Sequence, residues 1–294
     1  MKPAHIGWLI TGGTGFLGRA LARELLDQGE ARVCIFSRSE AAQAAMRAEF
    51  NDDPRLRWFI GDVRDKPRLR WAMESVNTVV HAAALKRIEV GVYNPAEMMK
   101  TNVLGTQNVI EAAIDAGVHS AILISTDKAV EPLNCYGATK LLAEKLFLGA
   151  SNTVGHYLAP KFSATRYGNV AGSTGSVIPI WREALAAGRK ITVRNPEATR
   201  FWITAPQAVA LVLQVNTLPG GTLLVPTLPA YRLGDLALAM LPEADLDVEV
   251  NDELGTDEKT HESLLAYGEP GGPRRSYDAP RMTIEALRME LAKL

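Results

Sequence analysis

The sequence predicts an α/β protein in which a doubly wound parallel sheet is joined to a smaller, discontinuous C-terminal lobe. Apolar, β-rich runs alternate with helical patterns through the first part of the chain, as is typical of βαβ units. The apolar runs are nearly continuous, which indicates strands that helices cover on both faces. With 294 residues, 47% of them hydrophobic, the chain can bury a large core in one enlarged domain or in two lobes.

The expected elements follow one another closely up to residue 188. Because strands and helices alternate, each crossover helix returns the chain to the end of the sheet where the parallel strands begin. Strands are expected at residues 6–13, 31–38, 56–63, 76–84, 119–126 and 162–170. Helices are expected at residues 16–28, 40–50, 95–116, 136–149 and 178–188.

The rhythm changes after Gly188. Segment 190–204 is short, polar and turn-rich, whereas residues 205–218 are helical and 221–227 are strand-like. One helix and one strand follow within residues 231–254, before a Gly/Pro-rich stretch. We therefore predict two parts. The sheet domain consists of residues 1–170 and 205–228, and the second lobe consists of residues 171–204 and 229–294.

Charge and cysteine content exclude several classes of partner. The formal net charge is -1, and no basic block is interleaved with aromatic residues, so nucleic acid is not expected as a partner. The first residues lack a signal-peptide layout, and no apolar run approaches the roughly 20 residues that span a bilayer, so we expect a cytoplasmic protein without a membrane partner. Cys34 and Cys135 have no metal-ligand spacing, and both are expected to be free thiols, with no metal site.

A glycine triplet lies between the first expected strand and the first expected helix, in "ITGGTGFLGRAL". Gly12 permits a tight turn, Gly15 lets the backbone approach a pyrophosphate, and Gly18 allows close helix packing. The helix N-terminus supplies amide donors for phosphates. The triplet predicts a Rossmann-like dinucleotide site to which the same turn contributes Thr14, Phe16 and Leu17.

Three later strand ends complete the expected cofactor site. About 20 residues after the triplet, where an acid would hold the ribose of NAD, stand Ser37 and Arg38. A guanidinium can pair with a 2′-phosphate, so NADP is expected and NAD is less favoured. Asp62 either accepts hydrogen bonds from the adenine or caps a helix. Val63, Ala82, Ala83 and Ala84 are further expected contacts, and Ser125, Tyr136 and Lys140 from the next part of the chain complete the set.

The stretch "STDKAVEPLNCYGATK" carries the expected chemistry. Tyr136 and Lys140 are four residues apart and share one face of a helix, where an ammonium favours the phenolate and makes the tyrosine a usable base. Thr126, Asp127 and Lys128 follow a strand at the carboxyl edge where parallel sheets bind ligands. An acid beside a base suits an elimination, in which one group removes a proton from carbon while another protonates the departing hydroxyl.

These motifs together resemble the extended short-chain dehydrogenases/reductases, and most closely the C5-inverting UDP-N-acetylglucosamine 4,6-dehydratases. The matching pieces span nearly the whole chain in order, and they include "TGGTGFLG", "FSRSE", "GDVRD", "HAAALK", "STDKA", "YGATK", "RYGNVAGSTGSVIP", "TRFWIT" and "EKTHE". The resemblance implies that NADP binds in the sheet domain and a nucleotide sugar, UDP-N-acetylglucosamine or a close relative, in the second lobe.

The resemblance also implies a mechanism and a set of site residues. Tyr136 takes the proton of the sugar 4-hydroxyl as hydride leaves carbon 4, and Ser125 or Thr126 orients the carbon 4 oxygen. Lys128 removes the proton at carbon 5, Asp127 protonates the hydroxyl leaving carbon 6, and hydride returns to carbon 6. The implied substrate contacts are Lys86, Asn169, Arg200, Glu258 and His261.

The sequence departs from the family pattern in two places and leaves two rival functions open. "LGTDEKTHE" lacks an arginine usual in relatives and gains Asp257, and Thr174 stands where relatives often have arginine. A nucleotide-sugar epimerase would need Tyr136 but no elimination pair, whereas a non-catalytic NADP-binding sensor would typically have lost the tyrosine and lysine. Similar proteins pair through the helices expected at 95–116 and 136–149, so a homo-oligomer is expected.

Overall fold

A parallel sheet organises the larger part of the molecule. The computed structural model describes residues 7–153, 160–241, 248–251, 258–272 and 274–294. Its main sheet has seven strands in the order β3-β2-β1-β4-β5-β6-β9, and every pairing is parallel. The strand order reverses between β1 and β4, which opens a crevice for ligands at the carboxyl ends of these strands. The strands are β1 (Trp8–Thr11), β2 (Val33–Ser37), β3 (Leu56–Ile60), β4 (Thr78–His81), β5 (Ser120–Thr126), β6 (Lys161–Tyr167) and β9 (Leu223–Leu224).

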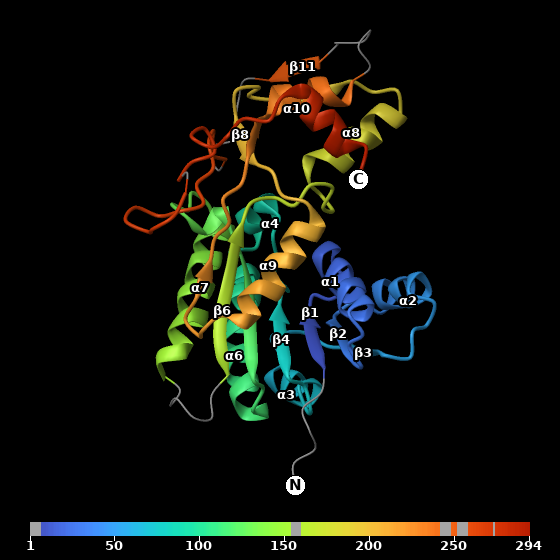
Figure 1. Cartoon of the computed structure of the whole chain (residues 1–294), viewed down its shortest axis with the longest axis vertical. Coiled ribbons are helices and arrows are strands. Elements are labelled where there is room, and N and C mark those ends of the chain that lie inside the picture. The colour runs from blue at the N-terminus through green and yellow to red at the C-terminus, as the bar shows by residue number, and fades with distance from the viewer. Residues whose placement is uncertain (1–6, 154–159, 242–247, 252–257, 273) are drawn as a thin grey trace.

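Helices cover both faces of this sheet, as the continuous apolar runs predicted (Figure 1). One hydrophobic cluster joins the sheet to α3 (Lys66–Ala72), α6 (Gly105–Ala116) and α7 (Cys135–Thr153). A second cluster joins the opposite face to α1 (Phe16–Asp27), α2 (Glu40–Glu49) and α9 (Ala205–Thr217). The predicted doubly wound, Rossmann-like architecture is therefore confirmed.

The long helix expected at residues 95–116 is interrupted. It consists of α5 (Pro95–Met99), a π-helical turn at Lys100–Leu104 and then α6. Inside the π turn, Asn102 accepts a hydrogen bond from Leu85 N at 2.8 Å and donates to Leu85 O at 2.9 Å. This side chain therefore holds the loop after β4, and π turns of this kind frequently occur at functional sites. The sequence patterns also missed α4 (Ile88–Tyr93), which precedes α5.

A second group of elements lies beyond the carboxyl edge of the sheet, in the upper part of Figure 1. Its hydrophobic cluster includes Trp181, Ile191, Leu236 and Leu287. In two small sheets, β7 pairs in parallel with β11, and β8 pairs antiparallel with β10. The elements are α8 (Val177–Ala186), β7 (Ile191–Arg194), β8 (Thr199–Phe201), β10 (Ala230–Arg232), α10 (Leu233–Met240), β11 (Val248–Asn251) and α11 (Ile284–Leu291).

Two expectations for this part were incomplete. Segment 190–204 was expected to be turn-rich, yet it contains β7 and β8, because Ile191 and Val193 are buried while their neighbours Thr192 and Arg194 are exposed. Such short half-buried strands are weak signals in a polar stretch. Helix α11 was not predicted, although Thr283 caps it by accepting a hydrogen bond from Ala286 N. The proposed domain boundaries stay a prediction.

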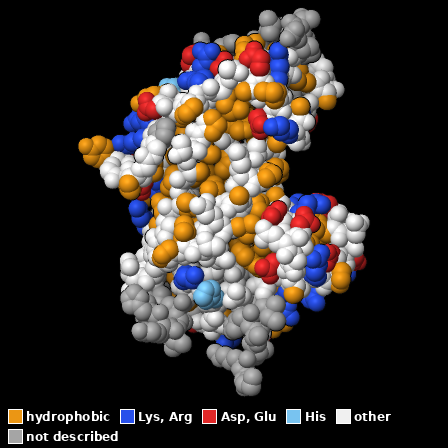
Figure 2. All heavy atoms as spheres, in the orientation of Figure 1, with side chains coloured by type: hydrophobic (Ala, Val, Ile, Leu, Met, Phe, Trp, Pro, Cys, Tyr) orange, Lys and Arg blue, Asp and Glu red, His pale blue; other side chains and the backbone are white. Residues whose placement is uncertain are grey.

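Figure 2 shows that the molecule is hollowed between the sheet and these upper elements, with hydrophobic side chains gathered along the hollow. Both cysteines are free, as predicted, and burial raises the pKa of the Cys34 thiol to about 11. Among the described residues, no helix is both long and apolar enough to cross a bilayer. The same residues hold no cluster of His, Cys, Asp and Glu that could bind a metal ion.

Candidate active site

The glycine turn after β1 has the geometry that its sequence predicted. Gly12 has a φ of +68°, and a side chain there would place its Cβ 2.9 Å from the backbone of Ala83. A Cβ on Gly18 would lie 2.5 Å from Gly13 O, so only glycine lets α1 pack this closely against the turn. Gly15 is the N-cap of α1 and bears no side chain that could fill the space in front of the helix. The turn therefore leaves the N-terminus of α1 accessible to an anion.

A pocket of about 550 Å³ lies along the carboxyl edge of the sheet. Its lining comes from the ends of β1, β2, β3, β4 and β5 and from α7, which brings together residues that are far apart in the sequence. The expected cofactor contacts that line it are Gly12, Thr14, Gly15, Phe16, Leu17, Gly18, Ser37, Arg38, Asp62, Val63, Ala82, Ala83, Ala84, Ser125, Tyr136 and Lys140. Residues that the sequence did not single out also line it, among them Ser39, Thr101, Tyr167 and Ser173.

At the end of the pocket near β2 and β3, two arginines lie close to the carboxylate of Asp62. Asp62 accepts hydrogen bonds from Arg64 N at 2.9 Å and Arg64 Nη2 at 2.7 Å, and its carboxylate lies 3.8 Å from Arg38. Hydrogen bonds from Arg64 hold the pKa of Asp62 below its usual value, against the opposing effect of burial. The alternative role of Asp62 as a helix cap is wrong, because Asp65 caps α3 by accepting from Arg68 N.

Tyr136 and Lys140 project from one face of α7 toward the end of β5. Burial raises the pKa of Tyr136 to about 12, while the nearby Lys128 ammonium and a hydrogen bond with Thr126 act to lower it. Lys140 Nζ donates to Ile124 O at 2.7 Å, and burial lowers the pKa of Lys140 to about 8. The Lys128 ammonium therefore favours the Tyr136 phenolate.

The elimination pair lies where β5 ends, in a 3₁₀ turn over Asp127–Ala129. Asp127 is 1% exposed, and its Oδ1 accepts a hydrogen bond from Thr126 Oγ1 at 2.9 Å. Lys128 Nζ donates to both carboxylate oxygens of Asp127, at 3.0 and 3.2 Å. Burial raises the pKa of Asp127 above its ordinary value, while the Lys128 ammonium and the hydrogen bonds from Lys128 and Thr126 act to lower it.

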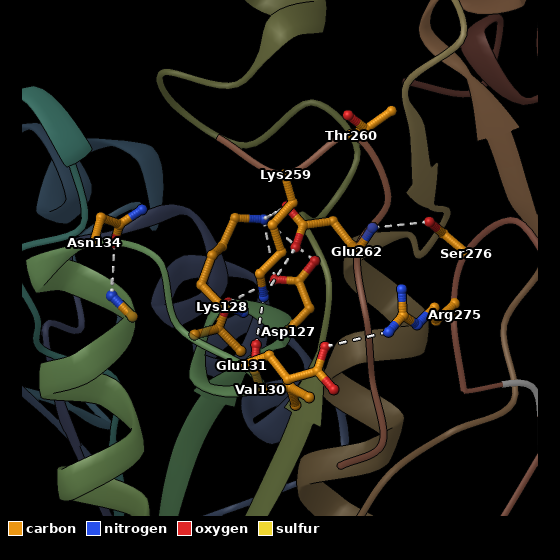
Figure 3. A network of polar contacts seen from close by, with 12 residues as sticks. Asp127, Lys128, Val130, Glu131, Asn134, Lys259, Thr260, Glu262, Arg275 and Ser276 are labelled. Atoms are coloured by element: carbon orange, nitrogen blue, oxygen red, sulfur yellow. Dashed lines mark hydrogen bonds and ion pairs between the residues drawn. The ribbon is translucent and has the colours of Figure 1, made fainter. Parts of the chain in front are cut away.

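A second carboxylate reaches Lys128 from the far end of the chain. Glu262 Oε1 lies 3.1 Å from Lys128 Nζ, and Asn169 Oδ1 accepts from the same ammonium at 3.3 Å. Figure 3 shows the side chains of Asp127, Lys128, Lys259 and Glu262 directed toward one another. The two carboxylates raise the pKa of Lys128, against the opposing effect of burial. Sequence reasoning missed Glu262, although it immediately follows His261 in the "EKTHE" motif.

Of the expected substrate contacts, Asn169 and Arg200 both approach this cluster. Arg200 Nη1 donates to Thr199 O and Thr260 O, and Arg200 Nε lies 3.9 Å from Glu262 Oε1. His261 Nδ1 is 2.8 Å from Thr199 Oγ1, and burial together with Arg200 lowers the pKa of its imidazole.

The remaining expected substrate residues are Lys86 and Glu258. Lys86 lines the pocket and donates to Thr174 O at 2.9 Å, and burial lowers the pKa of its ammonium. Glu258 is half-buried. Asp257 and the rest of the altered segment 254–257 lie outside the described residues.

A buried charge network connects β5, β6 and α7. Glu144 on α7 accepts hydrogen bonds from Ser125 Oγ at 2.5 Å and from Arg166 Nη2 at 2.5 Å. Arg166 is 1% exposed, and it also donates to Leu264 O and to Glu269. The network thus fixes the segment that carries Glu262 to β6 and α7 of the main sheet domain.

Comparison with known proteins places this site in a family. The model of the polysaccharide biosynthesis protein family matches residues 8–277, which is most of the chain. The chain belongs to this family. The family match covers the glycine turn, the Tyr136 and Lys140 pair, the Asp127 and Lys128 pair and the Glu262 segment.

Individual relatives agree with this assignment. A UDP-N-acetylglucosamine 4,6-dehydratase (inverting) of Campylobacter jejuni is 42% identical over 261 residues, which cover 88% of this chain and 77% of the relative. A UDP-glucose 4-epimerase of Rickettsia rickettsii is 37% identical over an alignment that covers 97% of this chain and 85% of the relative. The X-ray structure of Pen from Bacillus thuringiensis superposes with a TM-score of 0.93 at 33% identity, over 100% of this chain and 99% of that one. The resemblance inferred from the motifs is confirmed.

Proposed function

We propose that this member of the family is a nucleotide-sugar 4,6-dehydratase that acts on UDP-N-acetylglucosamine and inverts carbon 5. The observation that carries the proposal is the buried contact between Asp127 and Lys128 beside Tyr136, at the end of a dinucleotide-type pocket. An acid and an amine in contact suit the loss of water. The inverting dehydratase of Campylobacter jejuni supports both the reaction and the substrate.

NADP is the proposed cofactor, with NAD less favoured. The glycine cradle fits a pyrophosphate, because Cβ atoms at Gly12 and Gly18 would collide with the backbone around them. At the ribose end, Arg38 is 55% exposed in its side chain and is held only loosely, 3.8 Å from Asp62, which leaves its guanidinium available to a 2′-phosphate. A bound NADP supplies a hydride acceptor for carbon 4 and a hydride donor for carbon 6.

Each protein group then has a separate task in the proposed reaction. Tyr136 takes the proton of the 4-hydroxyl, with Thr126 or Ser125 orienting the carbon 4 oxygen and the Lys140 ammonium held one helical turn away. Asp127 gives a proton to the hydroxyl leaving carbon 6, a task that fits a carboxyl whose pKa is raised by burial. Lys128 takes the proton at carbon 5, and for this its ammonium must first lose a proton, since two carboxylates favour its charged form.

The substrate is proposed to enter from the side of the upper elements. Arg200 is suited to a diphosphate through its fork of donors, and Asn169 lines the cofactor pocket. Lys86 on the pocket wall is a further candidate for the diphosphate or the sugar. Glu258 and His261 are proposed to contact the nucleotide, as their family segment implies.

The runner-up function is a nucleotide-sugar epimerase. It is favoured by the Rickettsia rickettsii epimerase, whose match covers nearly the whole of this chain. Against it stands the buried Asp127 and Lys128 contact, because exchange of configuration at carbon 4 alone needs no elimination. A non-catalytic NADP-binding regulator is least favoured, since Tyr136 and Lys140 are both in place.

Incubation of the purified protein with UDP-N-acetylglucosamine and NADP in deuterium oxide tests the proposal. We expect loss of water and an inverted 4-keto-6-deoxy product that carries deuterium at carbon 5, observed by NMR and mass spectrometry. A product that keeps its carbon 6 hydroxyl and differs only at carbon 4 would establish the epimerase instead. Unchanged substrate would reject both and direct the search to other nucleotide sugars.

We also propose that the protein forms a homo-oligomer through α4 to α7. Large hydrophobic side chains are exposed along these elements, and Tyr93, Met99, Leu104 and Leu142 are each at least 45% exposed. Such a concentration of exposed apolar residues is typical of a protein interface. Light scattering during size-exclusion chromatography should give a mass above the 31.9 kDa of one chain.

A further inference from the structure

Glu262 is a buried carboxylate to which the proposed reaction has so far given no task. It is 3% exposed and comes from the segment after Lys259, whereas two of the cations that it faces are Lys128, which follows β5, and Arg200, which lies in β8. Its Oε1 lies 3.1 Å from Lys128 Nζ and 3.9 Å from Arg200 Nε. Its Oε2 is buried, lies 3.9 Å from Lys259 Nζ and accepts no hydrogen bond within the described part of the chain. A carboxylate is rarely buried in this way unless cations hold it.

The Asp127 and Lys128 pair has a proton problem if it acts alone. At the moment of elimination, Asp127 must hold a proton for the leaving hydroxyl, while the Lys128 amine must have lost its extra proton to receive one from carbon 5. Asp127 cannot accept that extra proton if it already carries its own. A second acceptor must therefore lie within hydrogen-bond distance of Lys128 Nζ, and Glu262 is a carboxylate at that distance.

We propose that Glu262 is a positioning residue of the active site, which holds the Lys128 ammonium at rest and accepts its extra proton when Lys128 acts as a base. This role rests on the proposed dehydratase function and specifies how its acid and base are made ready together. Glu262 acts through Lys128 rather than on the sugar.

The proton transfers balance over the elimination. At rest, Asp127 is a neutral carboxyl, Lys128 an ammonium and Glu262 a carboxylate. Lys128 passes one proton to Glu262, takes the proton of carbon 5 as the carbon 5–carbon 6 double bond forms, and Asp127 protonates the hydroxyl that leaves carbon 6 as water. Lys128 then returns a proton to Asp127 and recovers one from Glu262, so that the three groups end as they began.

The surrounding charges agree with the resting distribution of protons. Asp127 and Glu262 have pKa values shifted in opposite directions, because burial dominates at Asp127 while Lys128, Arg200 and Lys259 favour the charged form of Glu262. Divergent values of this kind separate an acid from its partner. The titratable and charged groups that face Lys128 or Glu262 are Asp127 after β5, Tyr136 on α7, Arg200 on β8, Tyr231 on β10 and Lys259 beside Glu262.

The test compares Glu262→Gln, Glu262→Asp and wild-type protein with UDP-N-acetylglucosamine and NADP. In Glu262→Gln we expect dehydration at neutral pH to fall on the order of 10²- to 10³-fold. Reduced cofactor should build up, because oxidation at carbon 4 is spared while elimination is slow. The residual rate should rise about tenfold per pH unit, since solvent hydroxide must then remove the Lys128 proton. Glu262→Asp should recover much of the rate with the wild-type pH profile.

Glu197→Gln is the matched control, because Glu197 is an exposed carboxylate paired with Arg232 away from the pocket. It should leave rate and pH profile unchanged, and NADP affinity and thermal unfolding of all variants establish that they are folded. Wild-type rates in Glu262→Gln, or the same altered pH profile in Glu262→Gln and Glu262→Asp, would overturn the role of Glu262 while the dehydratase stands. Absence of dehydration by the wild type would overturn the proposed function and this role with it.

Discussion

Glu144→Gln is the substitution for which the structure makes the firmest quantitative prediction. Glu144 is fully buried, and its two carboxylate oxygens accept hydrogen bonds from Ser125 Oγ, Arg166 Nε and Arg166 Nη2. Glutamine keeps the shape but removes the charge and replaces one acceptor oxygen with a donor. Arg166, which is 1% exposed, would keep Glu269 as its one remaining carboxylate partner in the network.

The expected cost follows from the burial of Arg166. Removing one partner of a buried ion pair typically destabilises a protein by about 3–5 kcal/mol, because the other charge stays buried without compensation. We expect the lower part of this range, since Glu269 still pairs with Arg166 at 2.6 Å. At about 2–4 °C per kcal/mol for a chain of this size, the melting temperature should fall by at least about 6 °C. Urea unfolding and thermal scanning of the cofactor-free protein measure both quantities.

A surface carboxylate provides the control for this experiment. Glu49 pairs with Arg19 and Arg23, but its side chain is 40% exposed, so Glu49→Gln should cost no more than about 1 kcal/mol. Equal losses in the two variants, both below about 1 kcal/mol, would refute the reasoning that Arg166 depends on Glu144. The same result would remove the argument that this network fixes the segment bearing Glu262.

Three further predictions concern the active site. Asp127→Asn and Lys128→Ala should each lower the rate of dehydration by about 10²-fold or more while NADP still binds. NMR of the product measures the rate, and cofactor fluorescence measures the binding. Near-normal turnover in either variant would contradict the assigned roles. Arg38→Ala should weaken NADP binding about tenfold to a hundredfold and leave NAD binding unchanged, as measured by calorimetry. An equal loss of affinity for both cofactors would show that Arg38 does not bind the 2′-phosphate. Burial lowers the pKa of Lys140 from 10.5 to about 8 in the folded state, so between these pH values the unfolded state binds more protons than the folded state. The wild type should therefore gain about 3 kcal/mol of stability relative to Lys140→Met as pH rises through this window. A stability difference that does not change with pH would exclude this shift.

The parts of the site that the sequence predicted well depend on short stretches of chain. Gly12 adopts the positive φ and Gly18 makes the close backbone approach that the triplet implied. Both features are required by a single turn between a strand and a helix, so they can be predicted from a few neighbouring residues. The spacing of Tyr136 and Lys140 placed both side chains in the pocket for the same reason, since four residues separate one helical turn from the next.

Local patterns failed where a choice depended on neighbours in space. Asp62 and Asp65 are both acids near the start of α3, and only the path of the chain decides that Asp65 caps the helix while Asp62 pairs with Arg64. The π turn at Lys100–Leu104 depends on contacts of Asn102 with the loop after β4, which no helical periodicity records.

The sequence by itself determined the succession of the main-sheet strands along the chain, the glycine cradle, the tyrosine and lysine on one helix face and the acid beside a base. Tertiary structure alone decided that Glu262 lies against Lys128, that the Lys128 ammonium favours the Tyr136 phenolate, and that Arg166 joins the segment after Glu262 to α7. Hydrophobic period and turn chemistry are properties of a few neighbouring residues. Charge states and ion pairs depend on burial and on distances between residues remote in the chain, which exist only once the sheet and the upper elements have packed together.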